Sequence, residues 1–178
     1  MIAPIHVRWG VPDDAYALAE IHVLAWQVGY RGLLPGSFLD SLSAVERLPR
    51  WRERLAETAS RVLVAELDGQ AAGWLVIGRQ RDEDLDAQRV AEIYAVYVHP
   101  DFWRQGCGVA LMARARAELA TQGFAEATLW VLRSNQRAIC FYEALGFRAD
   151  GASKVETNRA GIVFDEVRYR CALGPLTA

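Results

Sequence analysis

A predicted strand turns into a predicted helix through the segment VHPDFWRQGCG, residues 98–108. Glycines at the start of a helix let the backbone approach an anion closely. The free N–H groups of the first helical turn then point at that anion, and the helix dipole favours its negative charge. The segment lacks both the Gly-Lys-Ser/Thr of a Walker loop and the three glycines of the dinucleotide fingerprint. It therefore predicts a phosphate-binding loop of another kind, with a plain chain reversal as the alternative.

Strand-like and helix-like patterns alternate on both sides of this segment. Apolar runs predict strands at residues 5–9, 62–65, 74–77, 93–98, 127–132, 147–149 and 163–173. Helical patterns cover residues 15–28, 37–42, 44–59, 108–122 and 136–145, and Pro49 is placed to kink or divide the third helix. Asp68-Gly69 between two strands is a hairpin signal. This order predicts one α/β or α+β domain with a mixed sheet over residues 1–173, followed by a loose tail at 174–178.

Length and composition indicate a single globular domain and argue against a nucleic-acid-binding or membrane-spanning protein. The length of 178 residues suits a single domain, and 52% hydrophobic with 24% charged residues is ordinary for a globular protein. A net charge of −2 gives no basic footprint of the kind that nucleic-acid binders carry. No run approaches the roughly 18 apolar residues of a membrane span, and the N-terminus has no signal-peptide pattern.

The cysteines and histidines do not form a recognisable ligand set. Cys107, Cys140 and Cys171 are widely spaced and odd in number, and neither CxxC nor HxxxH occurs. We therefore expect no disulfide framework and no metal site. Free cysteines fit a reducing compartment, so we expect a cytoplasmic protein.

Three runs of sequence carry a family resemblance. They are EIYAVYVHP at residues 92–100, GCG at 106–108 and NQRAICFYEALGF at 135–147. Together they closely resemble the GNAT family of N-acetyltransferases, the first two its motif A and the third its motif B, NxxAxxFYExLGF. The family usually has Gln or Arg where this chain has Trp103, so no side-chain role is carried over to that position.

The resemblance implies the acyl-CoA N-acyltransferase fold: an α/β (α+β) arrangement with a mixed, mostly antiparallel central sheet of about seven strands and four to five flanking helices. Strands four and five of that sheet splay apart, and acetyl-CoA, the co-substrate, enters the gap as a strand-like element. Its pantetheine would pair with the main chain around Val96, Tyr97 and Val98. Its pyrophosphate would bind the loop amides of Arg104, Gln105, Gly106, Cys107, Gly108 and Val109.

Acetyl transfer to an amine requires a base for the amine and an acid for the departing thiolate. Tyr142 is the candidate acid, because a phenol with a pKa of about 10 is protonated at neutral pH. Glu92 is the candidate base, directly or through water. For Tyr142 the alternative is core packing beside Phe141, and for Glu92 a solvated position at a strand end. Asn135 resembles a coenzyme-contacting residue of the family, although it is also placed to cap the following helix.

Two further features concern the chemistry and the acceptor. A covalent acyl-enzyme on Cys107 or Cys140 has little support, because no histidine is adjacent to activate either thiol.

By the resemblance, the region of Trp26 and Tyr30 covers the acceptor, with core or lid packing as the alternative. A loop at residues 150–161 is expected to close the other side. The resemblance also implies that an amide near Val98 would hold the oxyanion, if a bulge leaves that amide unpaired.

The sequence therefore predicts an N-acetyltransferase that moves an acetyl group from acetyl-CoA to a primary amine by direct attack in a ternary complex. The acceptor, a small molecule or a protein amine, is not identified. Relatives are often dimers, and the long C-terminal strand suits a homodimer. The rival hypothesis is a non-catalytic domain that binds or senses acyl-CoA, and a third is that the motifs serve structure alone.

Overall fold

The computed structural model describes residues 4–57 and 61–174, and the seven strands within them form one sheet in the order β1-β2-β3-β4-β5-β7-β6. Neighbouring strands are antiparallel except β4 and β5, which run parallel. The predicted mixed, mostly antiparallel sheet is thus confirmed. The expected tail at 174–178 lies outside the described residues, apart from Gly174.

The elements follow the predicted order along the chain. The strands are β1 (His6–Trp9), β2 (Arg61–Leu67), β3 (Gln70–Arg79), β4 (Val90–Val98), β5 (Glu126–Leu132), β6 (Arg148–Thr157) and β7 (Val163–Ala172). The helices are α1 (Ala15–Gly29), α2 (Gly36–Asp40), α3 (Ala44–Ala56), α4 (Cys107–Thr121) and α5 (Gln136–Ala144). Single 3-10 turns, η1 (Pro12–Asp14) and η2 (Pro100–Phe102), lie ahead of α1 and α4.

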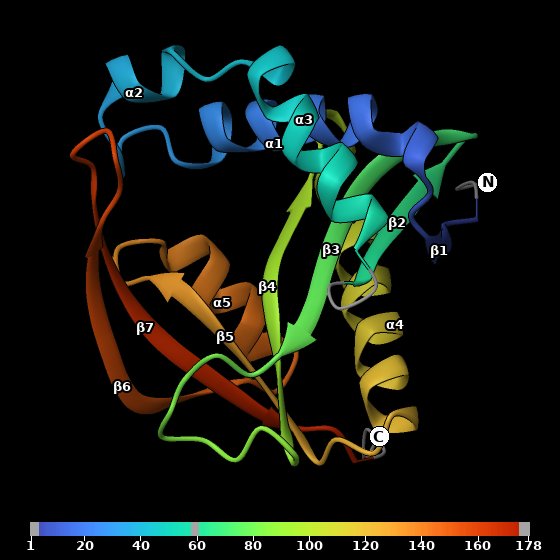
Figure 1. The fold of residues 1–178 in the computed structure, drawn as a ribbon, viewed down its shortest axis with the longest axis vertical. Coiled ribbons are helices and arrows are strands. Elements are labelled where there is room, and N and C mark those ends of the chain that lie inside the picture. The colour runs from blue at the N-terminus through green and yellow to red at the C-terminus, as the bar shows by residue number, and fades with distance from the viewer. Residues whose placement is uncertain (1–3, 58–60, 175–178) are drawn as a thin grey trace.

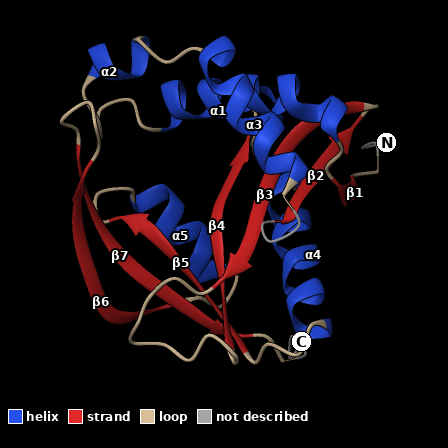
Figure 2. Ribbon diagram, in the orientation of Figure 1, coloured by secondary structure: helices blue, strands red, loops and turns tan. Residues whose placement is uncertain are grey.

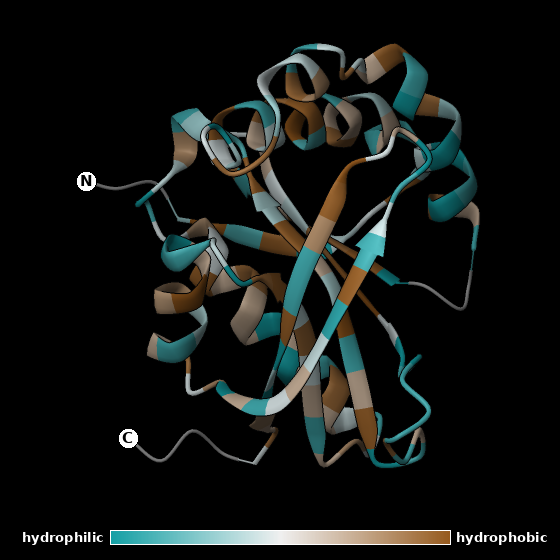
Figure 3. Ribbon diagram, turned by 90° about the vertical axis from the view of Figure 1, so that its left-hand side faces the viewer, coloured by the Kyte–Doolittle hydropathy of each residue, from teal (hydrophilic) through white to brown (hydrophobic). Residues whose placement is uncertain are grey.

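The sheet is covered on both faces. Alternation along β2 sends Leu63 and Ala65 into a core shared with α4, whereas Val62 and Val64 enter a second core beneath α1 and α3. Figures 1 and 2 show α1 and α3 together on one side of the strands and α4 on the other. Bands of hydrophobic and hydrophilic residues alternate along the covering helices, as expected for helices with one buried face (Figure 3).

Two local predictions meet different outcomes. The Asp68-Gly69 hairpin is confirmed, because both residues have positive φ, 52° and 74°, and join β2 directly to β3. Of the two outcomes predicted at Pro49, a kink or a division, the division does not occur, since that residue lies inside a continuous α3. The predicted third helix ends at Ala56, and residues 58 and 59 of the prediction lie outside the described part of the chain.

The prediction of a loop at residues 150–161 is wrong for residues 150–157, whereas residues 158–161 do lie in the turn between β6 and β7. β6 continues to Thr157 and pairs with β7, from Ser153 opposite Val167 onward. The glycine that suggested a loop, Gly151, has φ of 93° and lies in a register shift between Ala149 and Ser153. A bulge absorbs such a residue without ending the strand, so residues 150–157 extend β6.

A bulge also interrupts β4. Its register with β3 moves by one residue between the pairs Val76–Ala95 and Ile77–Ile93, which leaves Tyr94 without a partner on β3. A bulge bends its strand and increases the local twist. The bend therefore begins two residues after Glu92, at the point where β4 separates from β5.

We expect Gly73→Ala to destabilise the sheet. A β-carbon there would lie 2.8 Å from the Tyr97 carbonyl oxygen and 3.2 Å from the Val98 α-carbon, and backbone atoms cannot turn aside. The expected loss in unfolding free energy is about 1–3 kcal/mol, measured by urea denaturation. Gly36→Ala is the control, because its β-carbon would meet an Arg31 side-chain nitrogen at 3.4 Å. Equal losses for both variants would contradict the steric argument.

His22 of α1 is enclosed by aromatic rings beneath the sheet. It stacks on Tyr97 with ring centroids 5.7 Å apart, and Trp26, Trp51 and Trp74 surround it at 5.3–6.1 Å. Within the described residues its buried Nε2 has no hydrogen-bond partner. Burial, aided by nearby arginines, lowers the pKa of His22 to about 3. The folded protein therefore holds this imidazole neutral at a pH where the unfolded chain protonates it.

This difference makes stability depend on pH. Below the unfolded pKa of 6.5 the unfolded state binds the extra proton, so the unfolding free energy falls as the pH falls toward the folded pKa. The His22 contribution is at most about 1.4 kcal/mol per pH unit. His22→Phe should flatten the fall between pH 6 and 4 when urea unfolding is compared with that of the parent chain. Parallel slopes for the two proteins would contradict it.

Candidate active site

The edge of β4 that faces β5 is open beyond Glu92. Parallel pairing joins three residue pairs, of which Glu92 with Thr128 is the last, while β5 remains paired with β7 along its length. The His99 amide donates to a β3 carbonyl at 2.8 Å. Because main-chain groups alternate in direction along a strand, those of Val96 and Val98 point to the opposite, open side. This is the edge that the sequence assigned to pantetheine.

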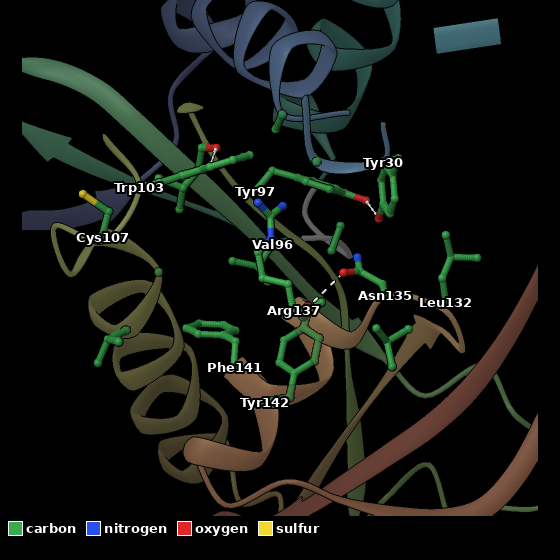
Figure 4. A pocket seen from close by; sticks show the side chains of 18 of the residues that line it. Tyr30, Val96, Tyr97, Trp103, Cys107, Leu132, Asn135, Arg137, Phe141 and Tyr142 are labelled. Carbon is green, nitrogen blue, oxygen red and sulfur yellow. Dashed lines mark hydrogen bonds between the residues drawn. The ribbon is translucent and has the colours of Figure 1, made fainter. Parts of the chain in front are cut away.

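A cavity of about 760 Å³ occupies the opening. Figure 4 shows Phe141 and Tyr142 reaching into it from α5, opposite the rings of Tyr97 and Tyr30. Of the residues predicted for the site, the lining contains Tyr30, Val96, Tyr97, Val98, Arg104, Gly106, Cys107, Gly108, Val109, Asn135 and Tyr142. Three predicted residues are not part of the described lining: Trp26, Glu92 and Gln105.

The loop before α4 is shaped to leave amides exposed. Arg104 and Gly106 both have positive φ, 62° and 96°, and Gly106 is the N-cap, so no side chain caps the first turn. A β-carbon on Gly108 would lie 3.2 Å from the Phe141 ring. The amides from Cys107 to Val109 lie at the uncapped start of a helix that lines the cavity, and such a helix start favours an anion. A non-glycine residue at positive φ costs energy, which is typical of functional loops.

Trp103 replaces the usual motif side chain with a different contact. Its indole Nε1 donates to the Val98 carbonyl at 2.7 Å. The Arg137 guanidinium stacks on its ring, 4.1 Å from the centroid. Trp103 thus braces the end of β4 against the loop, and it brings a cation to the cavity wall beside Arg104.

Tyr142 projects from α5 into the middle of the cavity. Its ring packs against Phe141 and Phe147, with centroids 5.4 and 6.1 Å away. Among the described residues, its hydroxyl has no hydrogen-bond partner. Burial, with a smaller effect of Tyr30, raises the pKa of Tyr142 well above its usual value. The phenol is therefore fully protonated at neutral pH and available as a proton donor.

Asn135 fulfils the capping prediction. Its side-chain oxygen accepts from the Ala138 amide at 3.1 Å at the start of α5, and the residue is 7% exposed. It also lines the cavity, so the cap fixes the helix that carries Tyr142.

Glu92 is sealed rather than presented to the cavity. Its side chain is 1% exposed, and its two oxygens bind Arg81 Nε at 3.0 Å and an Arg81 terminal nitrogen at 2.5 Å. The Arg81 guanidinium in turn stacks on Tyr94, 4.2 Å from its centroid. The structure therefore gives Glu92 a partner that would have to move before the carboxylate could accept a proton from an amine.

The two aromatic residues predicted for the acceptor side, Trp26 and Tyr30, differ in whether they line the cavity. Tyr30 lines the cavity and its hydroxyl lies 2.8 Å from that of Tyr97. Trp26 instead packs behind it, against Tyr30, Phe38 and Phe164, with centroids 5.0–6.3 Å apart. The packing alternative for Trp26 therefore describes its position.

The thiols are not set up as nucleophiles. Cys107 is 1% exposed, and burial raises the pKa of its thiol. A raised pKa keeps the sulfur protonated, the opposite of an activated cysteine. Cys140 is exposed and lies on α5 outside the described lining.

Comparison with known proteins decides the family. The model of the Acetyltransferase (GNAT) family matches residues 15–147. This chain belongs to the GNAT family of acetyltransferases. The uncharacterized N-acetyltransferase YuaI of Bacillus subtilis is 32% identical over 143 residues, covering 79% of this chain and 78% of that protein. The probable N-acetyltransferase Rv2775 of Mycobacterium tuberculosis is 27% identical over 168 residues, covering 93% and 92%.

Solved structures agree on the fold of this acetyltransferase. The paiA N-acetyltransferase from Thermoplasma acidophilum, in complex with coenzyme A, superposes with a TM-score of 0.70 at 20% identity, covering 95% of this chain and 99% of that one. The yncA protein of Salmonella typhimurium, with acetyl-CoA, gives 0.70 at 22% identity, covering 99% and 98%. The predictions of the acyl-CoA N-acyltransferase fold and of an acetyl-CoA-dependent N-acetyltransferase are confirmed.

The residues of this acetyltransferase fit such a co-substrate. The uncapped helix start and the cations Arg104 and Arg137 suit phosphates, and the open edge of β4 suits amides. Within residues 4–57 and 61–174, no group of three His, Cys, Asp or Glu side chains could hold a metal ion. In the same ranges no helix is both long and apolar enough to cross a membrane.

Sequence reasoning missed several lining residues, among them Trp130, Arg137, Phe141 and Glu166. Phe141 and Arg137 lie inside the third family run, where Phe141 was treated as packing. Glu166 lies within the long strand predicted at residues 163–173, and the sequence does not single it out as a site residue. Alternation puts Glu166 on one face with Phe164 and Arg168, but it does not reveal that this face borders a cavity.

The loop and helix start at residues 104–109, called the cradle from here on, predict a strong effect of Gly108→Val. The added side chain would press on Phe141 and fill the space before the first-turn amides. We expect coenzyme A binding, measured by calorimetry, to weaken at least about tenfold, or about 1.4 kcal/mol. Ala117→Val adds the same methyl groups to an exposed position of α4 and should bind as the parent does. Unchanged affinity for Gly108→Val would refute the cradle.

Proposed function

We propose that this GNAT acetyltransferase transfers the acetyl group of acetyl-CoA to a primary amine by direct attack in a ternary complex. The observation that carries the proposal is the cavity, which runs along an open strand edge from an uncapped helix start to a protonated phenol. When bound, acetyl-CoA supplies an activated acyl group as a thioester. The chain's own residues position it and move the protons.

The cradle residues orient the co-substrate in this proposal. Amides of Arg104 to Val109 would bind the pyrophosphate, including that of Gln105, whose side chain is held by a bond to the Asp101 carbonyl at 2.8 Å. Main-chain groups of Val96 and Val98 would pair with pantetheine amides. Because Trp103 already donates to the Val98 carbonyl, the Val98 amide is the group left for a ligand there. The bulge at Tyr94 lies further back along β4 than the predicted oxyanion donor.

Tyr142 would donate its phenolic proton to the departing sulfur. Its position in the cavity and its raised pKa support this role. Glu92 as base remains a prediction, and its ion pair with Arg81 means that it would act through water or after that pair opens. Homodimerisation, a cytoplasmic location and a single domain over residues 1–173 also stay predictions.

The function is tested by incubating the purified chain with acetyl-CoA and a panel of primary amines, following free coenzyme A and acetylated amine by chromatography. Transfer to at least one amine is expected. Calorimetric binding of acetyl-CoA with no transfer to any amine would favour the rival sensing domain. No binding at all would mean that the motifs serve structure alone.

Tyr142→Phe should separate chemistry from binding. Loss of a positioned proton donor is expected to lower kcat by about 10²-fold or more. The affinity for coenzyme A should stay within about threefold, because the ring and its packing remain. Tyr16→Phe is the matched control, since Tyr16 is 52% exposed on α1. An unchanged kcat for Tyr142→Phe would remove this residue from the mechanism.

A further inference from the structure

One carboxylate borders the cavity among the described lining residues. The charged side chains of that lining are Arg104, Arg137 and Glu166. Glu166 lies on β7 opposite Leu132, the last residue of β5, and therefore at the wide end of the opening between β4 and β5. The cations suit the phosphates of the co-substrate, whereas Glu166 suits a positive charge.

Glu166 is poorly neutralised by the protein itself. Lys154 lies 3.6 Å from its Oε2, but the same ammonium is closer to Glu156, at 3.0 Å, and stacks on Trp130 at 4.5 Å. The Glu166 side chain is 21% exposed, and burial raises its pKa. Glu92, by contrast, is held by two short bonds to one guanidinium. Of the two carboxylates, Glu166 is therefore the one that is less tightly paired with a cation.

Aromatic and apolar side chains line the same cavity as this carboxylate. They include Tyr30, Tyr94, Trp130 and Leu132. Burial raises the pKa of Tyr30, and the hydrogen bond to Tyr97 lowers it. The negative charge of Glu166 has the next largest effect and also raises that pKa, so the two side chains are close enough to interact electrostatically. Aromatic faces attract ammonium groups and exclude water from an apolar ligand body.

We propose that Glu166 binds the ammonium group of the acceptor, and that the acceptor is a cationic primary amine with an apolar or aromatic body. The inference rests on the proposed function, because it assigns the acceptor to the same cavity. The ammonium would replace part of the Lys154 contact at Glu166, and the body would lie against Tyr30 and Trp130.

The test compares a charged probe with its neutral counterpart. Calorimetry in the presence of coenzyme A measures binding of 2-phenylethylamine and of 2-phenylethanol to the parent chain, to Glu166→Gln and to Glu156→Gln. We expect Glu166→Gln to weaken amine binding at least tenfold and to leave alcohol binding and coenzyme A binding within twofold. Glu156→Gln removes the competing partner of Lys154, so the Lys154–Glu166 pair should strengthen; amine binding should weaken less than in Glu166→Gln, and alcohol binding should not change.

The outcomes separate the two hypotheses. Equal weakening of amine and alcohol would indicate a merely structural role, and it overturns the assignment of Glu166. So does an unchanged amine affinity in Glu166→Gln, or a parent chain that binds the amine no better than the alcohol or not at all. Selective amine binding with no acetyl transfer would support the assignment of Glu166 and contradict the proposed function.

Discussion

The separation of β4 from β5 is the constraint on which the rest of the site depends. Two parallel strands would ordinarily satisfy each other's main-chain groups, yet here pairing stops at Glu92 and Thr128. The bulge at Tyr94 bends β4 just beyond that point. Gly78 leaves room for the Tyr94 ring, and the Tyr94 hydroxyl donates to the Arg79 carbonyl at 2.8 Å. Unpaired main-chain groups within a protein demand a partner, and a ligand with amides can supply one.

Buried polar contacts hold the opening at its closed end. Gln80 donates to Thr128 at 2.6 Å, across the last strand pair. Arg168, whose side chain is 5% exposed, binds three carboxylates, those of Asp82, Asp84 and Asp150. A buried guanidinium requires such compensation, so the loop between β3 and β4 is tied to β6 and β7. The strands can diverge at one end because they are fixed at the other.

Burial sets the protonation of the groups inside this frame. Tyr142 and Tyr97 keep their phenolic protons, and His22, stacked on Tyr97, stays neutral. Glu92 is paired with Arg81, whereas Glu166 reaches the cavity and shares Lys154, 3.6 Å away, with Glu156. The arrangement places donors along the middle of the cavity and a single described carboxylate at its wide end.

The sequence by itself determined the order of elements, the Asp68-Gly69 hairpin, the strand-to-helix cradle and the family motifs, because these depend on neighbours within a few residues. It could not determine that residues 150–157 extend a strand through a bulge, that Glu92 is capped by Arg81, or that Glu166 borders the cavity. Each of these depends on strand register and on contacts between distant segments. Only tertiary structure fixes these, since alternation gives a residue's face but not what covers it.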